Sequence, residues 1–97
     1  MKDIEELKEI IKDSRKTLED EYSVKEIALF GSYVTGDQGE ESDLDILVEF
    51  SKPVGLFRFI ELEEYLSKTL GVKVDLVSKK ALKPRIGRNI LQEMVPV

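Results

Sequence analysis

Three aspartates stand in the two most regularly alternating segments of the sequence. Asp43 and Asp45 lie two residues apart in Ser42–Phe50, so both carboxylates leave the same face of a predicted strand. Asp75 is the midpoint of the other alternating segment, Val72–Ser78, on its polar face. If the two strands are neighbours, three carboxylates meet on one patch and repel one another unless a cation compensates. Mg²⁺ suits such oxygens and completes its shell with waters and substrate phosphates, so two ions there would orient a nucleoside triphosphate.

A glycine-serine turn supplies a second candidate site. Gly31 and Ser32 directly follow Val24–Phe30, an apolar run that predicts a buried strand, so backbone N–H groups and the Ser32 hydroxyl can face a phosphate chain. Gly31 and Gly36 also satisfy the glycine spacing of a P-loop. Asp and Gln follow Gly36 in place of the Lys and Ser or Thr that a P-loop needs, so this is not a P-loop.

The composition excludes several classes of chemistry. The 97 residues contain neither Cys nor His, which removes disulfides, thiol nucleophiles, imidazole bases and most transition-metal sites. Twenty acidic residues against 15 basic ones give a net charge of −5, which disfavours direct binding to nucleic acid by the chain alone. No apolar run is long enough to span a membrane, and the first residues lack a signal-peptide pattern, so a cytoplasmic protein is expected.

The elements that must position these residues follow from hydrophobic periodicity. Helical spacing predicts helices over residues 2–20, 56–70 with Gly71 as the C-terminal cap, and 85–94 after Pro84; the glycine-rich segment 31–41 is a loop, with one helical turn allowed near Ser32–Thr35. Together with strands over 24–30, 42–50 and 72–78, this order predicts an α/β (α+β) fold in one domain, residues 1–97. Helices pack on a small mixed sheet of about three strands.

The order Gly31-Ser32, then Ser42-Asp43-Leu44-Asp45, then Val74-Asp75-Leu76 resembles the signature of the polymerase-β-like nucleotidyltransferase superfamily. The resemblance covers essentially the whole chain. Its short length is similar to that of the minimal nucleotidyltransferases (MNT), the antitoxin halves of HEPN/MNT toxin–antitoxin pairs.

The resemblance implies a role for each matching residue. Asp43 and Asp45 would bind both metal ions, and Asp75 would bind the catalytic metal and help to deprotonate the attacking hydroxyl. Ser32 and the Gly31 backbone would hold the β- and γ-phosphates of ATP. The implied activity is Mg²⁺-dependent transfer of AMP from ATP to a tyrosine of a cognate HEPN ribonuclease toxin, which silences the toxin. The family often has Arg just before the second glycine of the turn; Thr35 stands there, so one cationic phosphate contact is missing.

Other interpretations remain open on the sequence alone. The chain would be a non-catalytic antitoxin if it neutralises its toxin by docking, or a small-molecule nucleotidyltransferase if a second copy completes the pocket. In a purely structural interpretation, the aspartates form the solvated face of an edge strand, and Ser32 is only a turn residue or helix cap. Two charged clusters can be interpreted simply as solvated surface. They are the acidic Glu61, Glu63 and Glu64, and the basic Lys79, Lys80, Lys83, Arg85 and Arg88.

Overall fold

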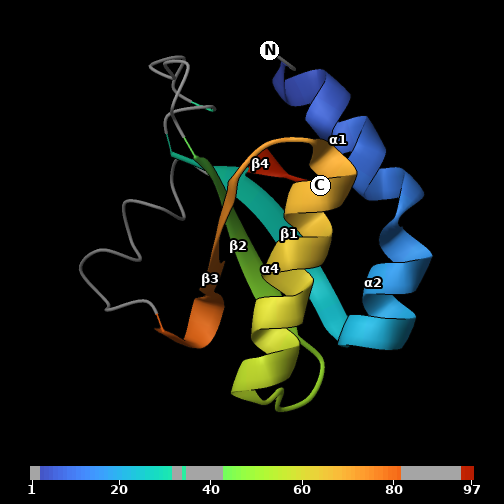
Figure 1. The fold of residues 1–97 in the computed structure, drawn as a ribbon, viewed down its shortest axis with the longest axis vertical. Helices are drawn as coiled ribbons and strands as arrows, with labels where there is room; N and C mark the ends of the chain where they lie inside the picture. The colour runs from blue at the N-terminus through green and yellow to red at the C-terminus, as the bar shows by residue number, and fades with distance from the viewer. Residues whose placement is uncertain (1–2, 32–33, 35–42, 82–94) are drawn as a thin grey trace.

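A computed structural model describes residues 3–31, Val34, 43–81 and 95–97 of the chain. A mixed four-stranded sheet lies at its centre, in the order β3-β2-β1-β4. The strands are β1 (Val24–Phe30), β2 (Leu44–Phe50), β3 (Val74–Ser78) and β4 (Val95–Pro96). β1 is antiparallel to both β2 and β4, whereas β2 and β3 are parallel. The starts of β2 and β3 therefore lie at the same end of the sheet, the upper end in Figure 1.

Three helices form the second layer: α1 (Ile4–Asp13), α2 (Arg15–Tyr22) and α4 (Leu56–Leu70). α4 lies in front of the sheet in Figure 1, over β1 and the end of β2, with α1 and α2 beside it. A short 3₁₀ turn, η1 (Lys79–Ala81), follows β3. No helix in the described part of the chain is long and apolar enough to cross a membrane.

The core lies between these two layers. Alternation along β2 places Leu44, Ile46 and Val48 under the helices, where none is exposed, and leaves Asp45 and Glu49 on the opposite face. The helices contribute the apolar residues at helical spacing. The core side chains outside β2 are Leu7, Ile11, Leu18, Val24, Ile27, Leu29, Leu62, Leu66, Leu70, Val74 and Leu76.

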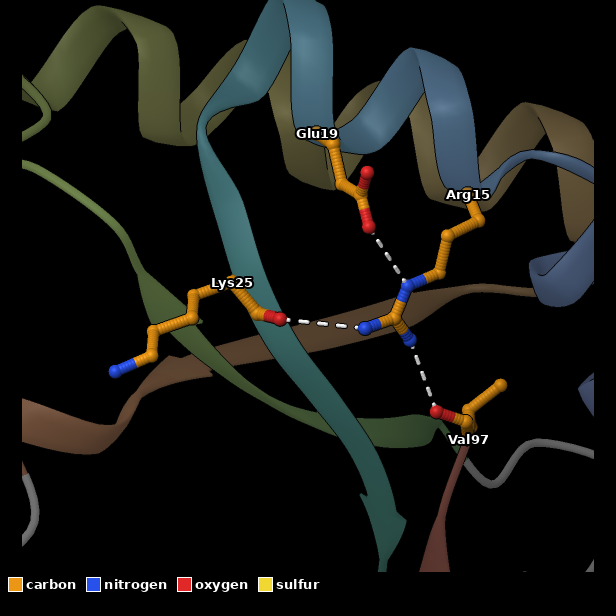
Figure 2. A network of polar contacts seen from close by, with 4 residues as sticks. All are labelled: Arg15, Glu19, Lys25 and Val97. Atoms are coloured by element: carbon orange, nitrogen blue, oxygen red, sulfur yellow. Dashed lines mark hydrogen bonds and ion pairs between the residues drawn. The ribbon is translucent and has the colours of Figure 1, made fainter.

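The Arg15 side chain links the start of α2 to β1 and to the residue that follows β4. Its guanidinium donates to the carbonyl oxygens of Val97 at 3.0 Å and Lys25 at 3.2 Å, and Glu19 accepts its third bond at 3.1 Å, as Figure 2 shows. The short β4 strand is paired with β1 through Ala28 and Leu29. Arg15 therefore holds the last residues of the chain against β1.

The sequence predictions hold for most elements and fail at two. The helix expected over residues 2–20 is two helices, because Ser14 leaves the helical conformation (φ −93°, ψ 1°) and its N–H bonds back to the carbonyl oxygens that end α1. The sheet has four strands rather than about three, because a Val-Pro pair is too short to give a periodic signal. The predicted helix 85–94 and the turn near Ser32–Thr35 fall outside the described residues.

Candidate active site

The sheet brings two of the predicted aspartates side by side. β2 and β3 are parallel neighbours with Asp45 opposite Asp75, and Asp45 also faces Phe30, the last residue of β1. Asp43 immediately precedes β2 and shares the face of Asp45 by the period of two. The two aspartate-bearing strands are therefore adjacent, as the predicted carboxylate cluster requires.

The pKa of the Asp45 carboxyl group is raised by its surroundings, which include the carboxylates of Asp75 and Asp43. Partial burial raises its pKa to about 6, and the charges of Asp75 and Asp43 and a hydrogen bond with the Asp75 side chain act in the same direction. Below about pH 6, without a cation, protonation of Asp45 relieves this repulsion. A divalent cation removes the same repulsion without a proton.

Gly31 makes room for the Asp45 carboxylate. Gly31 has φ +81°, the left-handed region that glycine adopts readily, and it directly follows Phe30, the residue of β1 that pairs with Asp45. A Cβ atom at this position would overlap the Oδ2 oxygen of Asp45 and lie 2.9 Å from its Cγ atom. The N–H of Val34 returns to the Gly31 carbonyl oxygen at 3.0 Å and closes the start of the turn. The backbone of the turn and the carboxylate of β2 are thus in direct contact.

The residues predicted to face the phosphates or a partner follow Gly31 and β3. Ser32, Thr35 and Lys83 lie outside the described residues, as do Arg85 and Arg88. Lys79 pairs with Glu49 at 3.9 Å at the far end of β2 from Asp45. The described part of the basic cluster is therefore not beside the aspartates.

We expect the raised pKa of Asp45 to appear as a pH-dependent stability. In metal-free protein the native state binds a proton at Asp45 that the unfolded state releases above its ordinary value of 3.8, so unfolding free energy from this group falls as pH rises from about 4 to about 6. Asp45→Asn should raise the unfolding free energy at about pH 8 by roughly 1 kcal/mol, the reduced value that partial solvent exposure allows, and by nothing below about pH 4.

Urea denaturation in excess EDTA measures this difference. Asp20→Asn, which removes an exposed carboxylate of α2, is the matched control and should show no comparable trend. A stabilisation by Asp45→Asn that is the same at both pH values would contradict the assigned cause.

Side chains of α4 hold the outer edge of the Asp75 strand. β3 is an edge strand, and its outward N–H groups would otherwise be unpaired. The Glu63 carboxylate accepts from the Leu76 N–H at 3.0 Å, and the Ser67 hydroxyl oxygen accepts from the Val74 N–H at 3.1 Å. These two bonds flank Asp75 on either side. The solvated interpretation of the acidic stretch is therefore wrong for Glu63, and helical periodicity carried no signal of this contact because it concerns a partner distant in sequence.

Glu63 is thus a positioning residue for Asp75. Glu63→Ala should lower turnover about tenfold and destabilise the fold by about 1 kcal/mol, because the Leu76 N–H loses its partner and the strand edge is released. Glu63→Gln keeps an acceptor oxygen and should restore most of the turnover. Exposed Glu64→Ala, one residue along, is the control. Steady-state kinetics beside thermal unfolding would separate the two effects, and equal turnover of Glu63→Ala and Glu64→Ala would refute the positioning role.

The chemistry of the aspartates fits a hard divalent cation. Within the described residues no three acidic side chains already stand in a ligand arrangement. The carboxylates of Asp45 and Asp75 are nonetheless in hydrogen-bond contact with the charge of Asp43 nearby, and carboxylate oxygens are the ligands that such a cation prefers.

The fold and the arrangement of the aspartates agree with the comparisons with known proteins. The nucleotidyltransferase domain family matches residues 4–97, and the chain belongs to this family. The protein adenylyltransferase MntA of Thermococcus cleftensis is 48% identical over 94 residues, which cover 97% of this chain and 95% of the relative.

Solved structures share the fold. A structure assigned to a minimal nucleotidyltransferase has 33% identity and a TM-score of 0.81, covering 99% of this chain and 97% of that one. A toxin–antitoxin structure with AMP-PNP has 28% identity and a TM-score of 0.74, covering 93% of this chain and 70% of that one. The expected α+β nucleotidyltransferase fold is confirmed.

Proposed function

We propose that this chain is a Mg²⁺-dependent protein adenylyltransferase that transfers AMP from ATP to a tyrosine hydroxyl of a HEPN ribonuclease toxin and thereby acts as its antitoxin. The observation that carries the proposal is the pairing of Asp45 with Asp75 on parallel strands, in direct contact with the Gly31 turn. The name of the Thermococcus relative supports AMP transfer to protein, and the AMP-PNP complex supports both an adenine nucleotide and a toxin partner.

Each residue takes a distinct role in this proposal. Asp43 and Asp45 would hold two Mg²⁺ ions, and Asp75 would help to hold the catalytic one. Gly31 and Ser32 contact the β- and γ-phosphates. When bound, the ions neutralise the triphosphate and lower the pKa of the acceptor hydroxyl.

The reaction is a displacement at the α-phosphorus of ATP. The tyrosine oxygen forms a bond to the α-phosphorus, and the bond from that phosphorus to the α,β-bridging oxygen breaks, so that pyrophosphate leaves. Asp75 accepts the hydroxyl proton or passes it to water. Because the site is built from carboxylates, its own negative charge would repel ATP without the cations, which is why the proposed activity depends on them.

Two labelled forms of ATP test the class of reaction. With Mg²⁺ and the HEPN toxin, label in the α-phosphate should enter the toxin, label in the γ-phosphate should appear only in pyrophosphate, and EDTA should stop both. Label from the γ-phosphate in the toxin would mean phosphoryl transfer and would overturn the proposal.

A docking antitoxin without catalysis is the alternative that the Thr35 substitution favours, since the usual cationic residue is absent there. In that case the toxin would be silenced with neither label incorporated. The same experiment therefore separates the two functions.

A further inference from the structure

The start of α4 carries an exposed apolar surface far from the aspartates. Leu56 is 71% exposed, Phe57 82% and Ile60 42%, and these are the exposed large apolar side chains of the described part of the chain. All three stand in the first two turns of a helix whose later turns expose charged residues. Isolated exposed apolar residues are ordinary, but a contiguous cluster marks an interaction surface.

A hollow of about 350 Å³ adjoins this cluster. Its lining is largely apolar and includes Phe50, Val54, Leu56 and Phe59. Three lysines, at positions 52, 79 and 80, and one carboxylate, Glu49, also line it. Lys79 is paired with Glu49, whereas Lys52 and Lys80 have no carboxylate partner within the described residues. The hollow therefore carries an excess of positive charge on a chain whose net charge is −5.

The helix terminus reinforces this local positive potential. α4 is preceded by Gly55 as N-cap, which offers no side-chain cap, and has no acidic residue in its first turn, unlike α1, which has the Asp3 cap and two glutamates there. The N-terminal end of a helix carries a partial positive charge that an anionic group stabilises. Lysines and helix terminus therefore favour the same kind of ligand, one with carboxylates around an apolar centre.

We infer that the start of α4, with Leu56, Phe57 and Ile60 at its centre and Lys52 and Lys80 on its rim, is the surface on which the protein acceptor docks. We call it the α4 docking surface. It fits a partner that presents one or more apolar side chains surrounded by Asp or Glu. The inference rests on the proposed function only in naming that partner as the HEPN toxin that receives AMP.

Charge complementarity favours this partner over a second copy of the chain. A symmetric dimer through the α4 docking surface would set the two lysine rims against each other, and like charges across an interface oppose association. Nucleic acid is also disfavoured, because the chain as a whole, with its net charge of −5, would repel a phosphate backbone. A protein with acidic residues around an apolar anchor would instead be attracted by the lysines and would bury its anchor against the apolar side chains.

The position of the surface is compatible with catalysis at the aspartates. β2 begins at the aspartates and ends at Phe50 beside the hollow, so about 20 Å of strand separates the two regions. Figure 1 places the start of α4 and η1 together at the lower end, opposite the starts of β2 and β3. A partner footprint of about 800 Å² spans such a distance, so one docked protein can reach both ends. Docking and chemistry can then be disabled separately.

The test compares binding of purified HEPN toxin to four forms of the chain by titration calorimetry. The forms are wild type, Leu56→Glu/Phe57→Glu, Lys52→Glu/Lys80→Glu and the control Lys68→Glu, which reverses an exposed charge in the last turn of α4. Acidic residues in a first helical turn complement the helix dipole, so the first variant should fold, and thermal unfolding checks this. The two docking variants should bind at least tenfold more weakly, and added NaCl should weaken wild-type binding. Lys68→Glu should bind as wild type does.

Each contrary outcome has a distinct meaning. Undiminished toxin binding by both folded docking variants overturns the inference while leaving AMP transfer, measured in parallel, as the separate test of function. Wild-type dimerisation that is lost in Leu56→Glu/Phe57→Glu would assign the surface to a second copy. Retention of a single-stranded RNA by wild type but not by Lys52→Glu/Lys80→Glu would assign it to nucleic acid. Either of these assignments replaces the proposed one.

Discussion

Asp43→Asn combined with Asp45→Asn is expected to reduce AMP transfer roughly a thousandfold or more while leaving the complex with the toxin intact. The two substitutions remove the charges that hold the cations and keep the size of the side chains. They also remove the burial of a charge and the carboxylate repulsion that together raise the pKa of Asp45, so the variant should be at least as stable as wild type.

Transfer rate and toxin binding, measured on the same preparations, check this prediction. Asp20→Asn with Asp13→Asn removes two exposed carboxylates from the helical layer and serves as the charge-matched control. Loss of toxin binding together with transfer would show that the aspartates support the interface instead, and unchanged transfer would exclude them as metal ligands.

Gly31→Ala is expected to have the second largest effect on activity and stability, because it disrupts the contact between the turn and Asp45. The new Cβ would overlap the Asp45 carboxylate, and φ +81° is strained for any residue with a side chain. We expect a loss of about 2 kcal/mol in unfolding free energy and a roughly hundredfold loss of turnover, since displacing a catalytic group by even 1 Å costs about that factor.

Gly55→Ala is the matched control for Gly31→Ala. Gly55 has φ −72°, and a Cβ built there meets nothing within 4 Å. Chemical denaturation and transfer kinetics should therefore show a small effect at Gly55 and a large one at Gly31. Equal behaviour of the two variants would refute the close packing of Asp45 on the turn.

Most of the sheet and of the aspartate cluster was predictable because local periodicity carries that information. Alternation in residues 42–50 assigned Asp45 to one face and Ile46 to the other, and the structure places both so. The helix 56–70 and its Gly71 cap were also predicted correctly, since a helical period and a left-handed glycine are local signals.

The features that sequence analysis missed depend on contacts between distant segments. The pairing of β4 with β1 and the bonds from Arg15 to Val97 join opposite ends of the chain. The Glu63 bond to Leu76 joins a helix to a strand edge, and nothing in a run of exposed glutamates distinguishes the one that has a backbone partner. Positive φ at Gly31 was foreseeable from the turn, but its contact with Asp45 required the strand register.

Intact-protein mass spectrometry of the HEPN toxin, after incubation with this chain, ATP and Mg²⁺, separates AMP transfer from docking. We expect a mass gain of one or more AMP units that disappears when Asp43→Asn/Asp45→Asn replaces the wild-type chain. An unmodified toxin that is nonetheless bound and silenced by wild type would refute AMP transfer and would make this nucleotidyltransferase fold a docking antitoxin.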